Sequence, residues 1–302
     1  MSTAGVFFLV LYSLIGAMLD VYLGHLFQET HPIVVMTIMF STTLLIFLAF
    51  QIKNFSGFIL TFRKHQKTIL YLNISSTISW IGFFFALKYI EPAISATLSL
   101  GLAPTITSLF WKRLRPEQPV TKKEMYDSFG ILFGCLFLAY ASLSGKSALE
   151  NVPVGETLLG VFFASFSALG VVGNAIFAKR LSDEKISAKR VLALRFYLLI
   201  FIGILLWPKT FVVSMPLYHF SISIILLAII SLVIPLFILQ LGIERCEPIT
   251  TNMILSSIPA FTYLLQFFDH RLTPSLYSLI GIALCVSFLL WGASARARRA
   301  FG

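Results

Sequence analysis

Residues 246–274 read CEPITTNMILSSIPAFTYLLQFFDHRLTP, and residues 90–116 read IEPAISATLSLGLAPTITSLFWKRLRP. Both stretches begin with a residue followed by Glu-Pro, and both continue through apolar residues interspersed with Ser and Thr. Each carries a second proline eleven or twelve positions later and closes on aromatic residues followed by Arg-Leu-x-Pro. The chain therefore contains one pattern twice, with its two copies beginning 156 residues apart.

The composition places the repeat in a membrane protein. Of 302 residues, 58% are hydrophobic and only 12% are charged, whereas a soluble domain has about a quarter of its residues charged. About 20 apolar residues are needed for one helix to cross the hydrocarbon layer. We predict ten spans: 4–25, 33–52, 68–89, 92–111, 126–143, 156–178, 190–207, 221–243, 248–267 and 275–293.

The basic residues give these spans a direction. If the N-terminus is cytoplasmic, 18 of the 23 Lys and Arg fall in inner segments. Four fall in outer loops, and Arg195 lies within a span. This asymmetry obeys the positive-inside rule and predicts that both termini face the cytoplasm. The net charge of +10 is then a consequence of topology, and we expect no nucleic-acid partner.

The repeat extends over both halves of the chain. GVFF at 5–8 returns at 160–163, and IMFSTTLLIF at 38–47 aligns with LRFYLLIFIG at 194–203. Five spans in each half would make the second half enter the membrane from the opposite face. We therefore expect an all-α polytopic membrane protein with ten transmembrane helices in a 5+5 inverted repeat, divided into residues 1–146 and 147–302. Secondary transporters have this architecture, with their site near the midplane.

With these features the chain resembles the EamA-type transporters of the drug/metabolite transporter superfamily. The resemblance rests on Pro104 with FWKRL (110–114) and Gly130, on Pro259 with FDHRL (268–272) and Gly281, and on LRF at 194–196. The family's usual Glu before Arg-Leu is Lys112 in the first half and His270 in the second. The resemblance implies a secondary transporter, usually an exporter, of a small amphipathic metabolite such as an amino acid or derivative. It also implies a bacterial inner membrane.

Two charged residues lie within the predicted spans, where a charge costs roughly 2.5–3.5 kcal/mol on insertion scales. Arg195 either extends its long side chain to the inner interface or takes an anion-binding or structural role in a cavity. Asp20 either couples transport to protons or serves as a hydrogen-bonded residue near the outer end of its helix.

Uncharged polar and aromatic residues supply further candidates for substrate binding. The amides are Asn73, Asn174, Gln240 and Asn252, which we place in one layer with Arg195; interhelical hydrogen bonding is the alternative role. Nearer the midplane are Trp80, Ser99, Tyr197 and Ser256, for which ordinary packing is the alternative. Pro104 and Pro259 are predicted mid-helix breaks that make the fourth and ninth helices cavity walls.

Several classes of function are disfavoured. The chain shows no nucleotide-binding, metal-ligand or paired-cysteine pattern, so we expect no cofactor, no metal, no enzymatic activity, and energy from a gradient or exchange. A nucleotide-sugar or phosphate-ester exchanger stays open but would require more in-span cations. An intramembrane enzyme acting on a lipid-linked substrate would require clustered acids or histidines. The expected partners are a small-molecule substrate, the bilayer and protons, and a homodimer is left open.

Overall fold

The computed structural model describes residues 3–110, 122–149, 152–209, 217–246, 254–255 and 257–300. Within these ranges the regular secondary structure is helical, and no strand occurs. Six helical runs are long and apolar enough to cross a membrane: Thr3–Glu29, Pro32–Ala49, Gln66–Tyr89, Met125–Leu143, Val154–Asp183 and Tyr218–Arg245. The described part of the chain is therefore all-helical and membrane-embedded.

The first half begins with the long helices α1 (Thr3–Glu29) and α2 (Pro32–Ala49). After them come the 3₁₀ turn η1 (Ile52–Asn54), the short helix α3 (Phe55–Lys64), and α4 (Gln66–Tyr89), α5 (Pro92–Leu109) and α7 (Lys122–Leu143). Pro32 and Pro92 occupy first helical positions, where a missing N–H removes no intrahelical hydrogen bond. Asn54 caps α3 by accepting a 3.1 Å hydrogen bond from the Gly57 N–H.

The second half begins with α8 (Val154–Asp183), followed by the short helices α9 (Ala188–Ala193) and α10 (Tyr197–Leu205). The helix α11 (Leu217–Ala228), the π-helical turn η2 (Ile229–Val233) and α12 (Ile234–Arg245) form one continuous run. The last elements are α14 (Ile258–Leu265), the 3₁₀ turn η3 (Gln266–Phe268) and α15 (Leu276–Ala300). Pro235, the second residue of α12, has no N–H to donate to the carbonyl group four residues earlier in the π turn, which accounts for the altered hydrogen bonding there.

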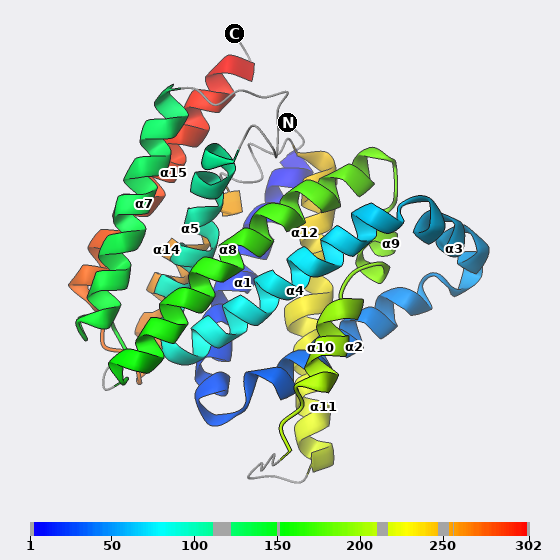
Figure 1. Ribbon diagram of the computed structural model, residues 1–302, viewed down its shortest axis with the longest axis horizontal. Helices are drawn as coiled ribbons and strands as arrows, with labels where there is room; N and C mark the ends of the chain where they lie inside the picture. The colour runs from blue at the N-terminus through cyan, green and yellow to red at the C-terminus, as the bar shows by residue number, and fades with distance from the viewer. Residues whose placement is uncertain are drawn as a thin grey trace.

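The long helices pack in pairs that join the two halves of the chain. Figure 1 shows α4 beside α8 across the middle of the molecule and α7 beside α15 at one side. Helix α1 packs on α12 and α14, while α5 packs on α8 and α14. Helix α2 contacts α9, α10 and α11. The beginning of α1 and the end of α15 lie at the same upper edge in this view.

Small residues bring α4 and α8 close together. A Cβ atom added at Gly170 would lie 2.3 Å from the backbone nitrogen of Ser79, and one added at Gly82 would lie 2.7 Å from the carbonyl oxygen of Phe163. The Ser167 hydroxyl donates a 2.8 Å hydrogen bond to the Ser79 carbonyl. Membrane helices associate through such close backbone approach, because lipid supplies little hydrophobic driving force between them.

The observed helices differ from the predicted spans in continuity. The predicted span 190–207 is divided, because α9 ends at Ala193 and α10 begins at Tyr197. The segment between predicted spans 33–52 and 68–89 contains the helix α3. Residues 248–253 and 256 of the predicted span 248–267 lie outside the described residues, and α14 covers most of its remainder.

Buried apolar side chains form two clusters. The larger is rich in phenylalanine and joins α1, α2 and α4 to the helices α8 to α12. The second lies among α5, α7, α8, α14 and α15. In the second cluster the Sγ atoms of Cys135 on α7 and Cys285 on α15 are 4.0 Å apart, and both are free thiols.

Candidate functional site

The backbone at the break between α9 and α10 is hydrogen-bonded to an amide side chain from another helix. Phe196 has a φ of +82°, a left-handed conformation that is a genuine outlier for a bulky residue. Asn73 on α4 donates a 2.9 Å hydrogen bond to the Leu194 carbonyl and accepts a 3.4 Å hydrogen bond from the Leu198 N–H. One side chain thus satisfies backbone groups on both sides of the break.

The break directs Arg195 into the bundle. This residue is only 7% exposed, and its Nε donates a 2.7 Å hydrogen bond to the Ser76 hydroxyl. The Ser76 hydroxyl in turn donates a 2.9 Å hydrogen bond to Asn174 Oδ1. In the part of the chain that the structure describes, no carboxylate forms an ion pair with Arg195. The guanidinium therefore retains capacity for an anionic ligand.

A cluster of packed aromatic side chains lies beside this polar group. Trp80 lies one helical turn beyond Ser76 on α4, and its ring centroid is 5.1 Å from that of Phe40. The Phe40 ring is also 4.8 Å from the Phe196 ring. The Arg195 guanidinium lies 5.1 Å from the Phe196 ring centroid. Among the described residues the buried Nε1 of Trp80 has no hydrogen-bond partner, so this aromatic cluster also contains an unused hydrogen-bond donor.

A buried carboxylate lies on α1. Asp20 is 7% exposed, and the Thr262 hydroxyl on α14 donates a 3.2 Å hydrogen bond to its Oδ2. No basic side chain within the described ranges forms an ion pair with Asp20. Asp20 and Arg195 both act electrostatically on Tyr12, which lies two turns before Asp20 on α1. Tyr12 is therefore near both Asp20 and Arg195, which form no ion pair with each other. We name Tyr12, Asp20, Ser76 and Arg195 the polar centre.

The remaining predicted site residues are distributed over several places. Asn73 and Asn174 join Arg195 through the contacts above, but Gln240 donates a 2.9 Å hydrogen bond to the Ser182 hydroxyl instead. The Ser99 hydroxyl donates to the Ala164 carbonyl at 3.3 Å. Tyr197 is 37% exposed and donates to the Ala193 carbonyl at 2.7 Å.

The two predicted helix breaks also occupy different environments. Pro104 lies inside α5, as expected for a mid-helix proline. Pro259 lies in the first turn of α14 instead. Asn252 and Ser256, the other two substrate-binding candidates, lie outside the described residues.

A second buried polar cluster lies just beyond the C-terminal end of α4, around Glu91. This carboxylate is fully buried and accepts hydrogen bonds from the Ser278 hydroxyl at 2.6 Å, the Ala148 N–H at 2.8 Å and the Gln266 amide at 2.8 Å. Burial raises the pKa of the Glu91 carboxyl, although these three hydrogen bonds act to lower it. Gln266 also accepts a 2.7 Å hydrogen bond from the Ala93 N–H. Glu91 thus ties the α4–α5 turn to α14, α15 and the segment before α8.

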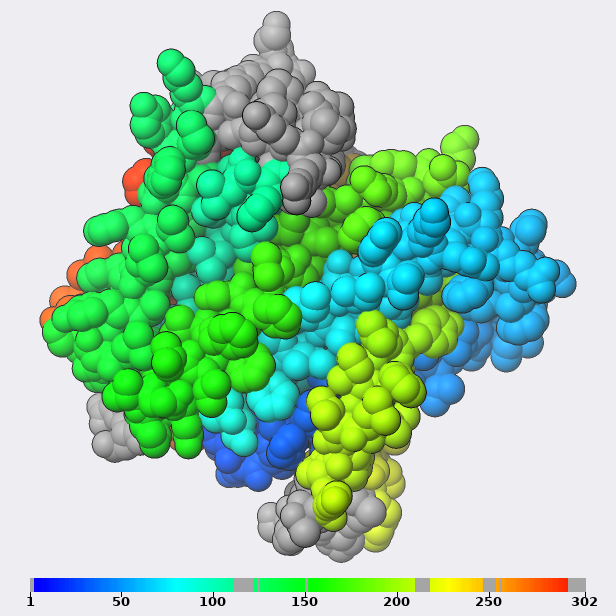
Figure 2. Space-filling view, viewed as in Figure 1, coloured from blue at the N-terminus to red at the C-terminus, as the bar shows by residue number. Residues whose placement is uncertain are grey.

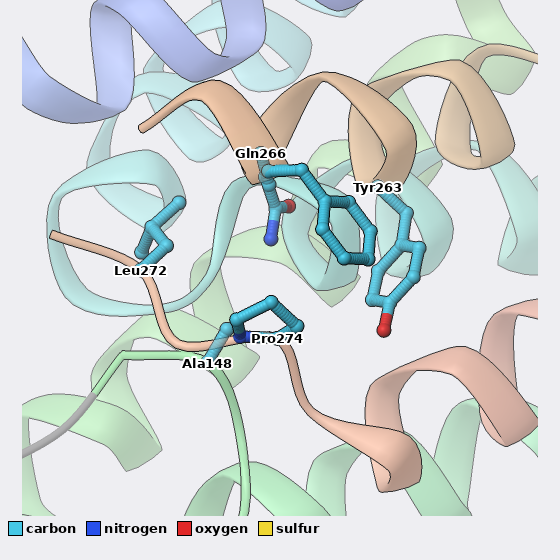
Figure 3. Close-up of a pocket in the computed structure, with 6 residues that line it drawn as sticks. Ala148, Tyr263, Gln266, Leu272 and Pro274 are labelled. Atoms are coloured by element: carbon cyan, nitrogen blue, oxygen red, sulfur yellow. The ribbon is translucent and has the colours of Figure 1, made fainter. Parts of the chain in front are cut away.

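A narrow hollow lies beside the Glu91 cluster (Figure 3). It is lined by Ala148, Tyr263, Gln266, Phe267, Leu272 and Pro274. The hollow is too narrow to hold a water molecule. We therefore assign no ligand to it, and the polar centre stays the better candidate because its buried charges lack ion-pair partners.

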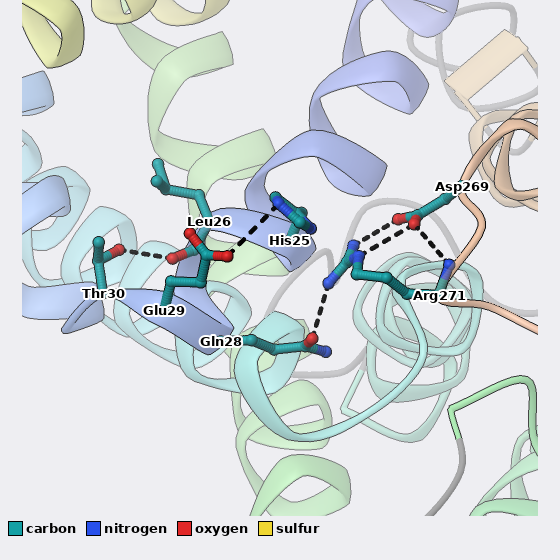
Figure 4. A network of polar contacts seen from close by, with 7 residues as sticks. All are labelled: His25, Leu26, Gln28, Glu29, Thr30, Asp269 and Arg271. Atoms are coloured by element: carbon teal, nitrogen blue, oxygen red, sulfur yellow. Dashed lines mark hydrogen bonds and ion pairs between the residues drawn. The ribbon is translucent and has the colours of Figure 1, made fainter. Parts of the chain in front are cut away.

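The second copy of the repeated motif takes part in a contact with the first helix. Arg271 donates to both carboxylate oxygens of Asp269 and, through a 2.7 Å hydrogen bond, to Gln28 at the end of α1 (Figure 4). Burial acts to raise the pKa of Asp269, but its interactions with Arg271 outweigh burial and hold that pKa below its ordinary value. This contact ties the α14–α15 connection to α1.

Four residues of these clusters could not be selected from the sequence: Tyr12, Ser76, Thr262 and Glu91. The hydroxyl residues lie in helices that contain many others, so residue type alone did not distinguish them. Glu91 stands in a turn, where a charged residue is expected to be solvated. The one available signal was that Glu91 is the first acidic residue after Glu29.

No protein-family model and no curated protein sequence matches the chain. A solved structure described as "Crystal structure of protein" is similar over 99% of this chain and 98% of its own, with 18% sequence identity and a TM-score of 0.66. At this identity the likeness shows the fold alone. Within the described ranges, no group of three or more His, Cys, Asp or Glu could hold a metal ion.

Proposed function

We infer that the protein is a secondary transporter of a small amphipathic metabolite that works by alternating access around the polar centre. An acidic group of the substrate would bind Arg195, and an apolar part would lie against Trp80 and Phe40. An amino acid or a derivative, moved outward, meets these requirements and agrees with the resemblance to EamA-type transporters. The expected setting is a bacterial inner membrane, with both termini in the cytoplasm.

The pairing of helices supports an inverted 5+5 repeat. The third predicted span, which contains α4, packs on the sixth, which contains α8. Likewise the eighth span, which contains α12, packs on the first, which contains α1. The fourth span (α5) packs on the sixth (α8), and the ninth (α14) packs on the first (α1). If each span of one half is replaced by its equivalent in the other half, the first contact of each of these two sets becomes the second. Such exchange of equivalent contacts is what alternating access requires of two repeats that rock around a fixed site.

The observation that carries the proposal is the pair of buried, mutually unpaired charges at Asp20 and Arg195. Leaving a charge buried without a partner in a membrane is costly, so residues of this kind mark substrate or ion pathways. The Thr262 hydroxyl and the Ser76 hydroxyl each supply one hydrogen bond, which is less than full ion pairing provides. A substrate anion at Arg195 and a proton at Asp20 would neutralise both charges.

Asp20 is suited to carry a proton because its carboxylate is near a hydroxyl and a phenol but has no cation bonded to it. Protonation would remove the charge on α1, while binding of an acidic group would remove the charge of Arg195 on the α9–α10 break. The two events act on opposite halves of the chain. Coupling would follow if the halves exchange their contacts most readily when both charges are neutralised.

The proposal is tested by reconstituting the purified full-length protein in proteoliposomes and screening a metabolite library for uptake and efflux. The assay is run with and without a proton gradient. We expect saturable transport of one group of acidic amphipathic molecules, with accumulation only when the gradient is present. If no metabolite moves and a lipid-linked substrate is chemically converted instead, the protein is an enzyme and the proposal is wrong.

A further inference from the structure

The short helix α3 has features that the transport proposal does not use. It connects α2, which ends at Ala49, to α4, which begins at Gln66, and both neighbours are candidate membrane spans. Figure 1 shows α3 at the edge of the molecule, away from the central helices. Because α2 and α4 bring the chain to the same membrane surface and only a short connection separates them, α3 must lie at that surface.

One face of α3 is fixed to the bundle. Phe58 is 5% exposed and belongs to the larger apolar cluster. One helical turn further, the Thr61 hydroxyl accepts a 3.2 Å hydrogen bond from Arg190, which also donates to Gln51 at 3.4 Å. Lys64 forms a 3.3 Å ion pair with Glu184 at the end of α8. These contacts set the rotation of α3 about its own axis.

Large apolar side chains are exposed on both flanks of this fixed face, with Phe55 and Phe62 on the flank next to Phe58 and Leu60 on the other flank. Leu60 is 68% exposed, Phe55 57% and Phe62 40%, and Ile52 in the preceding turn is 73% exposed. Apolar side chains exposed along one flank of a short helix at the membrane surface, as Phe55 and Phe62 are, allow such a helix to insert at the boundary between headgroups and acyl chains. Figure 2 shows this region projecting from the right side of the molecule rather than lying beneath other elements.

Basic side chains accompany the apolar ones. Lys53, Arg63 and Lys67 are exposed, and among the described residues none of them forms an ion pair with a carboxylate. No Asp or Glu occurs between Glu29 and Glu91 in the sequence. The surface of α3 therefore combines apolar insertion with unneutralised positive charge, the combination that binds anionic lipid.

We propose that α3 is an interfacial helix that binds the phosphate headgroups of anionic phospholipids through Lys53, Arg63 and Lys67. Phe55 and Phe62, which share one flank of the helix, lie among the upper acyl chains and hold the helix in the interface. The site is independent of the polar centre. It anchors the α2–α4 connection, whose partner Arg190 belongs to α9, the helix that precedes the break at Arg195.

The test measures binding of phosphatidylglycerol to the detergent-solubilised full-length protein by native mass spectrometry. The charge variant K53Q/R63Q/K67Q is compared with the matched control K88Q/K146Q/K209Q, which removes three cations elsewhere. A third variant, K53R/R63K/K67R, keeps all three charges. Each cation near an anionic surface contributes roughly fivefold to binding, so we expect the charge variant to bind at least about tenfold more weakly. Both other variants should bind like the wild type.

Further arms of the test identify the ligand and the position of the helix. Phosphatidylcholine should bind weakly to every variant, and inorganic phosphate at equal concentration should not displace phosphatidylglycerol. A nitroxide at position 55 in phosphatidylglycerol vesicles should be accessible to oxygen and protected from a water-soluble relaxant. The proposal is overturned if the charge variant binds phosphatidylglycerol as tightly as the control, if inorganic phosphate displaces the lipid, or if the nitroxide is fully exposed to water.

Discussion

The Nε of Arg195 donates a 2.7 Å hydrogen bond to the Ser76 hydroxyl, so the break between α9 and α10 is bonded directly to the middle of α4. This contact joins residues 119 positions apart, one in each predicted half of the chain. It fixes the guanidinium while leaving its terminal nitrogens without a carboxylate partner among the described residues. The arrangement makes Arg195 the first residue to test for substrate binding.

Replacing Arg195 with Gln should weaken recognition of an acidic substrate group. A hydrogen bond to a charged partner is worth about 1.5–3 kcal/mol, so we expect substrate affinity in proteoliposomes to fall by roughly tenfold or more. S76A should have a smaller effect, because it removes the support of the guanidinium and not its charge. R245Q, which removes an exposed arginine at the end of α12, is the control. Equal affinity in R195Q and R245Q would contradict the assignment.

Replacing Asp20 with Asn should separate transport from the proton gradient. The amide keeps the size of the side chain and can still bond to Thr262, but it cannot take up and release a proton. We therefore expect D20N to lose gradient-driven accumulation while retaining counterflow exchange of labelled substrate. D183N, which changes an exposed acid paired with Lys179, should retain both activities. Gradient-driven accumulation by D20N would show that protons are carried elsewhere.

Removing the Asn73 side chain should destabilise the break in the seventh predicted span. In N73A the Leu194 carbonyl and the Leu198 N–H lose their shared partner, and an unsatisfied buried backbone group costs about 1–3 kcal/mol. We expect a clear fall in the melting temperature of the detergent-solubilised protein. T77V is the control, since the Thr77 hydroxyl bonds to the Asn73 carbonyl within α4 and not to the break. If N73A and T77V have the same melting temperature, Asn73 does not stabilise the break.

Adding one methyl group at Gly170 should weaken the contact between α4 and α8. The new Cβ would lie 2.3 Å from the Ser79 backbone nitrogen, which cannot move without shifting α4. G16A is a matched control, because a Cβ there meets no atom within 4 Å and alanine favours the helix by about 1 kcal/mol over glycine. We expect G170A to melt at a lower temperature than the wild type, and G16A at the same or a higher one. A G170A protein as stable as G16A would contradict the observed packing.

The sequence was sufficient for the helical membrane fold but not for its breaks. Long apolar runs predict helices through the lipid requirement that every backbone group be bonded internally, and six such runs are present in the described chain. The interruption at residues 194–196 was not predicted, because apolar residues continue on both sides of Arg195 and the run is long enough for one span. The break depends on Asn73, 121 residues earlier, and no local pattern carries that information.

The sequence predicted the charged residues of the polar centre but not the hydroxyl residues that bond to them. Arg195 and Asp20 were selected by the cost of placing a charge in lipid, which depends on position in one helix alone. Ser76 and Thr262 gain their roles from what they face on another helix, so residue type did not distinguish them. Whether these residues bind substrate stays a prediction for the transport assays. Glu91 shows the same limit most clearly, because its burial is created by residues 57 to 187 positions away.

Glu91 should make the stability of the protein depend on pH. Burial raises its folded-state pKa above 4.5, so the folded protein binds a proton more tightly than the unfolded chain does. The resulting stabilisation is fully present below about pH 4.5 and is lost as pH rises through the raised folded pKa. Asp269 has a lowered pKa and therefore acts in the opposite sense, but only below its ordinary value of 3.8. Burial and the nearby Lys88 lower the pKa of His31 below 6.5, so His31 also acts in the opposite sense below pH 6.5. The contribution of Glu91 above pH 4.5 is therefore read from the difference between the wild type and a variant that lacks this carboxyl.

Two variants should change the pH dependence of stability in opposite directions. E91Q cannot ionise, so its melting temperature should fall less than that of the wild type as pH increases from 4.5. S278A loses the 2.6 Å hydrogen bond that favours the ionised carboxylate, so its folded pKa should rise further and its loss of stability should extend to higher pH. S287A, which removes an exposed hydroxyl bonded within α15, should follow the wild type. If E91Q and the wild type lose stability in parallel, another group governs this pH range, because a side chain that cannot titrate cannot contribute to the slope.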